Sequence, residues 1–501
     1  MTAHTDQHRS TKIAWICAVI TAALGATILF AAEPGLNWPI WVAAACASLL
    51  IARYSSIGRV ELPLAILCTW ATILSVAFAL TTADAFPGFI LLADAMLLGL
   101  AVITLGAERW ADLSAKLLAT VPFLAPMRVF ATTAQEVAGA PRSVSSPRSR
   151  ALVRGGLITV PLVIILVALL ASADPILSWG TGRIASWLPD WSFPPRLVFF
   201  LFLLALTLGA NALGVRQLSV RLPQYPSVPG RIWIGMTEQR MILWSTAVLL
   251  WVFVGLQISY FIHPPPAALG TGITFAEYAR RGFGELSFAA TIVGAIIIIL
   301  QYARPADLSS RDRTTLQRLD FALLLALELI LISAFRRVLL YEQAYGFTEA
   351  RVIAQAYMAG MALALAALAR EIPRGSISVS FGRRVAEIAL AVFTVLAFWN
   401  FQAWIVNRNV DRLASGAQFD ASYLSRLSAN AIPALIERLP EIPQPQRDTV
   451  ERRIACRRLP SNERWFEWNR SVSAARSAMA NWKGPTCPPK VQPATPQTVD
   501  D

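Results

Sequence analysis

Charged and tyrosine side chains at the ends of apolar runs are the residues best placed to do chemistry. Residues 275–286, FAEYARRGFGEL, carry Glu277, Arg281 and Glu285 at steps of four, with Tyr278 beside the first acid. In a helix these two acids and one base share a face, where charge-assisted hydrogen bonds can join them. The spacing predicts a polar network, and Glu277 or Glu285 could serve an enzyme as a general base.

A second cluster follows in AFRRVLLYEQAYGFTEAR, residues 334–351. Gly346 is a natural helix C-cap and Thr348 a natural N-cap, so the segment predicts a tight helical hairpin. Only about fourteen apolar residues precede the arginine pair, too few to cross a bilayer, which places that pair within membrane depth. Glu277 or Glu285 is the expected partner, in a structural network or in a substrate or signal site. The candidates here are Arg336, Arg337, Tyr341, Glu342, Tyr345, Thr348 and Arg351.

Two acidic residues fall near the middle of apolar runs, Asp94 and Glu328. A carboxylate at membrane depth is expensive, and transporters use such groups as proton or cation sites. The alternative is a carboxylate that is paired or protonated inside a helical bundle. Asn211 is the other polar marker of a transport path.

Histidine and cysteine usage limits other chemistry. The chain has three histidines and no G-x-x-x-x-G-K-[ST] motif, so we expect no metal site, no cofactor and no ATP-driven activity. Three of the five cysteines lie in apolar runs and are expected to be buried hydrophobic residues. Cys456 and Cys487 lie in the polar C-terminal region, where they form a disulfide if that region faces an oxidising compartment and remain thiols otherwise.

The elements that must position these residues are membrane spans. Of 501 residues 55% are hydrophobic and 15% charged, and the mean hydropathy is +0.53, which excludes an ordinary soluble enzyme. We predict an all-α polytopic transmembrane helical bundle of about eleven spans, with a small C-terminal extramembrane helical domain. The predicted spans are 13–32, 38–52, 62–81, 87–106, 153–172, 196–214, 241–262, 286–302, 320–340, 352–369 and 385–405.

The net charge of +13 follows the same topology. With the N-terminus inside, about 23 basic residues fall in inner loops and seven in outer loops, the positive-inside pattern. We therefore expect a cytoplasmic N-terminus, an extracytoplasmic C-terminal domain and contact with anionic lipids on the cytoplasmic side, without nucleic acid as a partner. An envelope protein is the other partner we consider.

The predicted organisation has five parts. Residues 1–106 form an N-terminal group of about four spans, and residues 107–152 a basic cytoplasmic loop with the interfacial segment LLATVPFLAPMRVF. Residues 153–405 form the main bundle of about seven spans. Residues 406–482 form the small helical domain, with helices expected over 421–438, 445–456 and 461–482, and residues 483–501 a disordered proline-rich tail.

Several strings, including FAEYARRGFGEL, SAFRRVLLYEQAYGFTEARV and WFEWNRSVSAARSAM, have a familiar order and spacing. Together they resemble a bacterial multi-pass membrane protein family of unknown function, domain of unknown function 4173, 4153-like, over about residues 150–482. The resemblance implies a bacterial plasma (inner) membrane protein and brings no established activity or cofactor. Its shared core would be Glu277, Tyr278, Arg281, Gly282, Arg337, Tyr341, Glu342, Gly346, Thr348 and Arg351.

The sequence therefore predicts an integral membrane protein with an envelope-associated binding, sensing or scaffolding role, built on an outer-side charged network. The alternative is a secondary transporter or channel that uses intramembrane carboxylates. An enzyme is the third class and is disfavoured, because no nucleophile or metal set accompanies the acids.

Overall fold

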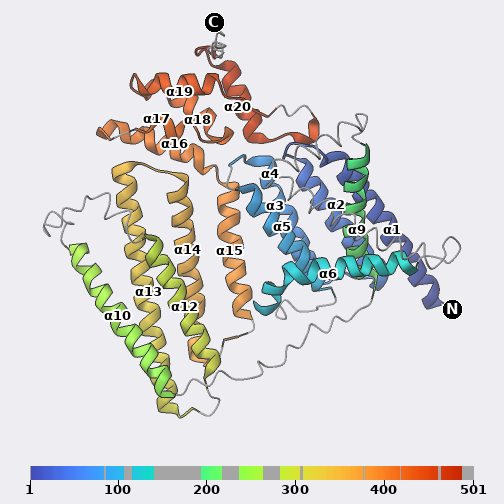
Figure 1. Ribbon diagram of the computed structural model, residues 1–501, viewed down its shortest axis with the longest axis horizontal. Helices are drawn as coiled ribbons and strands as arrows, with labels where there is room; N and C mark the ends of the chain where they lie inside the picture. The colour runs from blue at the N-terminus through green and yellow to red at the C-terminus, as the bar shows by residue number, and fades with distance from the viewer. Residues whose placement is uncertain are drawn as a thin grey trace, which may run out of the picture.

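The computed structural model describes residues 2–83, 86–105, 115–139, 193–216, 236–262, 283–304, 308–375, 377–378, 380–417, 419–460 and 464–487. In these ranges the chain forms helices and turns and no strand. Most of the long helices run in the same general direction, and a layer of shorter helices covers one end of them (Figure 1). We call the covered end the upper end and the opposite end the lower end.

The first group of helices comes mainly from the N-terminal part of the chain. It contains α1 (Thr2–Ile28), α2 (Asn37–Ile57), α3 (Leu62–Ser75), α4 (Ala77–Leu80), α5 (Phe86–Ile103) and α9 (Phe193–Val215). Alanines at steps of four, from Ala14 to Ala26, are buried along α1 and let α9 approach closely. Two polar side chains of α9, Thr207 and Asn211, donate hydrogen bonds to the α1 carbonyls of Ala18 and Ala14, each at 3.2 Å.

The second group contains α10 (Met236–Ile262), α12 (Phe283–Ala303), α13 (Ser310–Tyr345) and α14 (Glu349–Ala369). It has its own hydrophobic cluster, in which Leu323 and Leu327 of α13 are fully buried. At 1.5 Å per residue the 36-residue α13 is about 54 Å long, more than a bilayer's hydrocarbon core, so its ends extend beyond that core.

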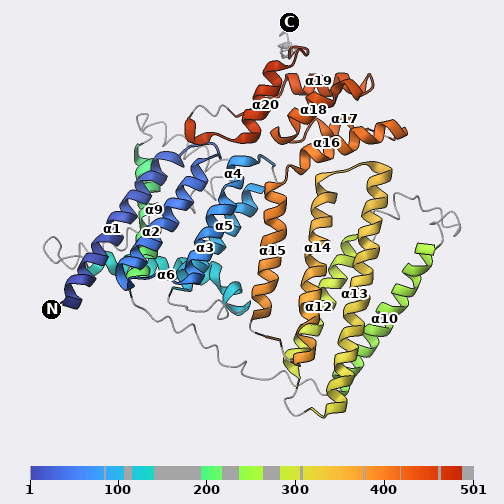
Figure 2. The ribbon, with the colours of Figure 1, turned by 180° about the vertical axis from the view of Figure 1, so that it is seen from behind.

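Two further long helices lie outside these two groups. Helix α15 (Ser380–Phe398) lies between the two groups, as the opposite views in Figures 1 and 2 show. Helix α6 (Ala115–Gly139) crosses the lower part of the first group and packs on α9 and α5. The interfacial segment predicted in residues 107–152 thus lies within one continuous helix that contains Pro122 and Pro126.

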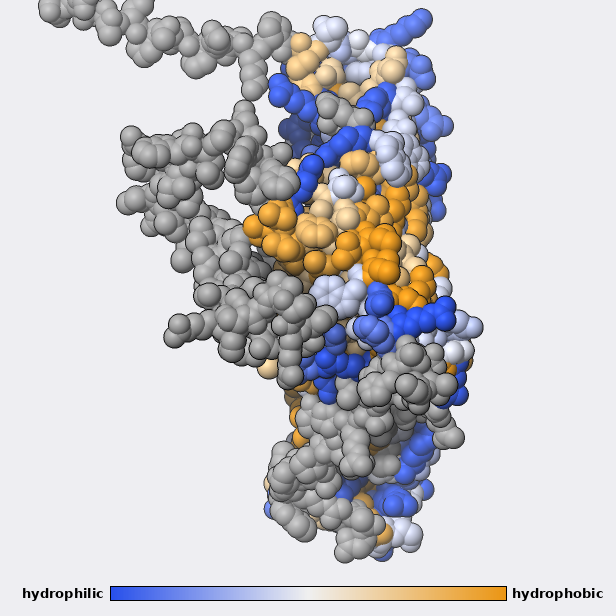
Figure 3. Space-filling view, turned by 90° about the vertical axis from the view of Figure 1, so that its right-hand side faces the viewer, coloured by the Kyte–Doolittle hydropathy of each residue, from blue (hydrophilic) through white to orange (hydrophobic). Residues whose placement is uncertain are grey.

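The helices have the dimensions of membrane spans. Seven are long and apolar enough to cross a bilayer, and the pair Ser380–Phe398 and Phe401–Ser415, bent by 65°, makes up to eight. On the face of the molecule where α1 lies, hydrophobic side chains gather in a band with hydrophilic ones above and below (Figure 3). The chain is therefore a multi-pass membrane protein. The predicted span 153–172 lies outside the described residues, and eleven spans are not established.

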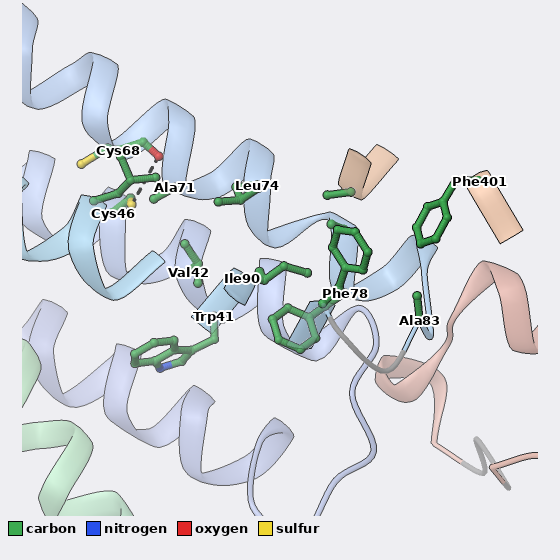
Figure 4. Packing of buried hydrophobic residues seen from close by; sticks show 14 of the residues in the cluster. Trp41, Val42, Cys46, Cys68, Ala71, Leu74, Phe78, Ala83, Ile90 and Phe401 are labelled. Atoms are coloured by element: carbon green, nitrogen blue, oxygen red, sulfur yellow. Dashed lines mark hydrogen bonds between the residues drawn. The ribbon is translucent and has the colours of Figure 1, made fainter. Parts of the chain in front are cut away.

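The C-terminal helices form the layer over the upper end. They are α16 (Phe401–Asp411), α17 (Ala421–Leu424), α18 (Ile432–Arg438), α19 (Gln446–Ala455) and α20 (Arg470–Asn481), joined by short 3-10 turns. Buried apolar side chains of α16 to α19 belong to the same hydrophobic cluster as α2, α3 and α5, whereas Val472 and Ala475 of α20 form a small cluster with Ala429 and Ile432. Phe401, for example, contacts Phe86 of α5 with ring centroids 5.6 Å apart, and it belongs to the cluster whose members Figure 4 shows.

Two helices predicted in this region have different bounds. The helix expected over 461–482 was wrong in its first part, because Asn469 caps α20 by accepting hydrogen bonds from the amides of Ser471 and Val472. The helix expected over 421–438 is two helices, α17 and α18, separated by a turn whose Ser428 hydroxyl accepts a bond from the Asn430 amide.

Candidate functional site

The turn between α13 and α14 is the centre of the candidate site. Gly346 ends α13 with φ +86°, and the Thr348 position precedes α14 with an extended backbone, as the cap residues predicted. The Thr348 side chain makes no cap hydrogen bond. Instead, Asn409 of α16 holds the turn, since its side chain accepts a bond from the Phe347 amide and donates one to the Phe347 carbonyl, both at 2.9 Å.

Two arginines meet at this turn. Arg351 of α14 donates a hydrogen bond to the Gly346 carbonyl, and its guanidinium carbon lies 4.1 Å from the centroid of the Tyr341 ring. Arg412, directly after α16, donates to the Gln343 carbonyl at 2.6 Å. The two charges lie close enough to repel each other. We call Arg351, Arg412 and the turn 341–349 the arginine corner.

The arginine corner contains two arginines and two acids, Glu342 and Glu349, and the acids bond to glutamines and not to the arginines. Within the described part of the chain, no carboxylate lies within salt-bridge distance of Arg351 or Arg412. One terminal nitrogen of Arg412, Nη1, is buried and has no hydrogen-bond partner among the described residues. Glu342 is 1% exposed and accepts a bond from Gln355 at 2.7 Å. A guanidinium in this setting is suited to bind an anion.

Polar contacts extend from the corner into the C-terminal helices. The Glu349 amide donates to the Tyr423 hydroxyl at 2.7 Å, and the Glu349 carboxylate accepts a bond from Gln402 at 2.6 Å. Burial of the Tyr423 phenol raises its pKa, and the nearby Glu349 charge adds to this, so the hydroxyl remains protonated. Gln402 in turn accepts a bond from Ser428. The corner is thus firmly attached to α16 and α17.

The other predicted site residues are only partly joined to this network. Glu277, Tyr278 and Arg281 lie outside the described residues, and of Glu285 only the backbone, in α12, is described. Arg336 and Arg337 are half-buried on α13, and Arg337 donates to Gln257 of α10 at 2.6 Å, a partner that the sequence did not suggest. Tyr345 stacks on Tyr341 with ring centroids 4.9 Å apart.

The candidate intramembrane carboxylates lie in different helix groups. Asp94 of α5 is 1% exposed and accepts one hydrogen bond, from the Trp38 indole at 2.7 Å, while its other oxygen has no partner among the described residues. Glu328 is half-buried on α13, in the second group. Asn211 donates to Ser48 at 2.6 Å within the first group. The three residues do not line one polar path.

Buried ion pairs at the lower end were missed by the sequence analysis. Arg53 pairs with Glu61, and Arg304 pairs with Asp320 at 2.6 Å; all four side chains are at most 6% exposed. Burial of Glu61 raises its pKa, but hydrogen bonds and charge from Arg53 outweigh this and hold the pKa below its usual value. In both pairs the partners lie on successive helices, at their lower ends, so a hairpin prediction with buried ends could have found them.

No group of three or more His, Cys, Asp or Glu residues able to hold a metal ion is present in the described ranges. Cys456, at the end of α19, and Cys487, after α20, form a disulfide. Cys46 and Cys68 are buried between α2 and α3, where the Cys46 thiol donates to the Cys68 carbonyl (Figure 4).

Comparison with known proteins identifies a family. The family model described as Domain of unknown function (DUF4153) matches residues 66–438, about three quarters of the chain. The matched region includes α5, the arginine corner and the Arg304–Asp320 pair. No curated protein and no solved structure matches the chain. The chain belongs to the DUF4153 family.

Proposed function

We propose that this DUF4153 protein is a bacterial plasma-membrane protein that binds an anionic group outside the cytoplasm, at the arginine corner. Two features support an orientation with the lower end in the cytoplasm and the upper end outside it. The lower end is rich in arginine, as cytoplasmic loops are, including Arg311, Arg313, Arg370, Arg374 and Arg384. The upper end contains the disulfide, and disulfides persist in oxidising compartments.

One observation carries the binding proposal: two arginines converge on the 341–349 turn, and no described carboxylate pairs with either of them. Several other buried or half-buried arginines of the described residues do pair with an acid, among them Arg53, Arg216, Arg304 and Arg384. Two arginines without a paired acid, beside a turn that Asn409 holds in place, form an arrangement suited to an external anion.

The proposed ligand carries a phosphate or carboxylate group. A guanidinium presents paired donors that match both groups, and charge-assisted hydrogen bonds of this kind contribute about 1.5–3 kcal/mol each. The Tyr341 and Tyr345 rings lie beside Arg351 and would contact the rest of the ligand. Glu342 is buried, and its carboxylate would repel the bound anion, which limits the negative charge of the ligand.

Titration of the purified full-length protein with inorganic phosphate and with acetate tests this proposal. We expect saturable binding of at least one anion by calorimetry, and a loss of about tenfold or more in affinity in Arg351→Gln and in Arg412→Gln. Arg408→Gln is the matched control, because Arg408 lies in α16 four residues before Arg412 but its guanidinium carbon lies over the Trp404 ring, 5.7 Å from the centroid. Equal losses in all three variants, or no binding to the wild type, would contradict the proposal.

Asp94 supports a second candidate, proton-coupled transport. Its carboxylate is fully buried in a span, with one oxygen unpartnered among the described residues, and a group at membrane depth in this state is a plausible proton site. Dicyclohexylcarbodiimide, which modifies protonated carboxyls in membranes, separates the two roles. If Asp94 is a transport site, its modification by dicyclohexylcarbodiimide should increase as the pH falls, and the variant Asp94→Asn should not be modified at this position. A carboxylate locked by Trp38 would not react at any pH.

A further inference from the structure

Helix α15 is apolar and central, yet few of its side chains are buried. Only Phe381 and Ala397 are buried among its 19 residues, whereas α13 on one side buries thirteen. Helix α14 packs along one face of α15. The face that looks toward α3 and α5 borders a cavity instead of close-packed side chains.

This cavity is an elongated groove between α3, α5 and α15. It has a volume of about 660 Å³, within the range of about 300–1,000 Å³ typical of small-molecule sites. Its walls are almost entirely hydrophobic, with Trp70 of α3, Met96 of α5 and Leu390 of α15 among the lining residues. The segment Leu62–Leu80, which contains α3, and the helix α5 have the length and hydropathy of membrane spans, and α15 has them together with the helix that follows it. Hydrocarbon is therefore the medium that surrounds the groove.

Charged residues line only the lower part of the groove. Arg383 and Glu387 both face it from the first turns of α15, and the Arg383 Nε lies 3.3 Å from a Glu387 carboxylate oxygen. Arg384 follows in the sequence and pairs with Glu371. Because Arg383 is three residues from the start of α15, it lies at the depth where lipid headgroups meet the hydrocarbon.

A second groove borders α15 on the side toward α14, shares Phe89, Ala389 and Phe393 with the first, and provides a comparison within the same molecule. It has a volume of about 330 Å³ and lies between α14, α15 and the start of α5. Its lining includes Ala356, Tyr357 and Val392, and none of its lining residues is charged. The two grooves therefore differ in the presence of an arginine.

We propose that the groove between α3, α5 and α15 binds an anionic phospholipid, with an acyl chain along α15 and the phosphate at Arg383. Basic pockets between spans on the cytoplasmic side are typical sites for anionic headgroups. The lining favours a lipid over a helix of a second copy, because charged residues line one end of an otherwise apolar groove, as a headgroup and an acyl chain require. This site is independent of the arginine corner.

Photocrosslinking of the full-length protein in liposomes tests this inference. The probes are phosphatidylglycerol and phosphatidylcholine that carry the same diazirine acyl chain, and peptide mass spectrometry locates the adducts. We expect adducts on α5 and α15 and about fivefold more of them from phosphatidylglycerol, since one arginine near a headgroup contributes about 1 kcal/mol. Arg383→Gln should remove that preference, while Glu387→Gln, which removes a competing acid, should increase it.

Groove-filling variants provide the matched control. Ala386→Phe narrows the groove between α3, α5 and α15 and should abolish adducts from both lipids, whereas Ala356→Phe narrows only the second groove and should preserve them. Arg311 is an exposed arginine at the start of α13, away from the groove lining, so Arg311→Gln should leave the lipid preference unchanged. Equal labelling by the two lipids, an unchanged preference in Arg383→Gln, or crosslinks between two protein copies at α15 would overturn the inference.

Discussion

Gly346 shows how one residue can shape the candidate site. Its φ of +86° is unfavourable for any residue with a Cβ, and a Cβ there would lie 2.2 Å from the Asn409 side-chain oxygen and 2.8 Å from Arg412 Nη1. Asn409 and Arg412 are the residues that hold the turn from α16. The turn therefore depends on the absence of a side chain at this position.

Gly346→Ala should accordingly destabilise the upper end. Backbone strain contributes about 1–2 kcal/mol, and the displaced Asn409 bonds add to it. Gly416→Ala is the matched control, because Gly416 has φ +72° but open space around its Cβ position, so only the backbone strain remains. Thermal unfolding in detergent should show a clearly larger loss for Gly346→Ala. Equal losses would mean that the contacts with Asn409 and Arg412 contribute little.

The Glu467 carboxyl group makes the stability of the upper end depend on pH. Its burial raises the pKa, but hydrogen bonds from Arg464 and from the Glu33 amide outweigh that effect and lower the pKa below its usual value. A carboxyl with a lowered pKa stabilises the fold above its unfolded pKa of about 4.3, and this contribution is lost as the pH falls through the folded value. The contact between residues 31–36 and the start of α20 should thus weaken in acid.

Hydrogen exchange measures this effect at one amide. The Leu36 amide donates to the Trp468 carbonyl at 3.1 Å, so its protection, corrected for the intrinsic rate, should fall as the pH drops below about 4.3. In Glu467→Gln, protection should be lower at neutral pH and should not fall further in acid. Protection that is constant in the wild type over this range would show that the ion pair does not support the contact.

At the scale of elements, α6 has the features of an interfacial helix. Two large hydrophobic side chains on it, Phe123 and Met127, are 72% and 69% exposed, although the helix packs on α9 and α5 through other residues. A helix that crosses the spans at the lower end and exposes such side chains is suited to rest in the headgroup region. Prolines in the segment did not prevent a continuous helix, which the sequence pattern could not show.

An environment-sensitive fluorophore tests the position of α6. In a protein with Cys17, Cys46 and Cys68 replaced, bimane at Phe123→Cys should emit at shorter wavelength and be quenched by lipids with spin labels near the headgroup. The reference position is Arg452→Cys, an exposed site on α19 in the C-terminal layer. Bimane at 123 that resembles bimane at 452 would place α6 in water.

Rules that depend on neighbouring residues predicted the helices and the turn at Gly346 better than they predicted contacts between distant residues. The helical hairpin at Gly346 and most of the spans follow from caps and hydropathy, which are properties of neighbouring residues. Arg412 and Asn409 were missed, because they reach the turn from more than sixty residues away in the sequence. The lower-end pair Arg304–Asp320 was missed because Arg304 was assigned to a loop and Asp320 to the end of a span, where burial is not expected.

At the scale of the whole molecule, the orientation in the membrane remains a prediction with a direct test. After replacement of Cys17, Cys46 and Cys68, Cys456 and Cys487 should react with a membrane-impermeant thiol reagent in intact cells only after reduction. Reaction that requires permeabilised cells would place the C-terminal layer in the cytoplasm and the lower end outside. The arginine corner would then face the cytoplasm, and the positive-inside assignment would be reversed.

The contacts of the C-terminal layer also set an order of events during synthesis. Glu467 binds the Glu33 amide across 434 residues, and Asn469 binds the Phe78 carbonyl across 391. At about 5–20 residues per second, the ribosome needs roughly 20–90 s between making these partners. During that time the Glu33 amide and the Phe78 carbonyl lack their hydrogen-bond partners. Insertion machinery or a chaperone that shields these two segments would therefore determine the yield of folded protein.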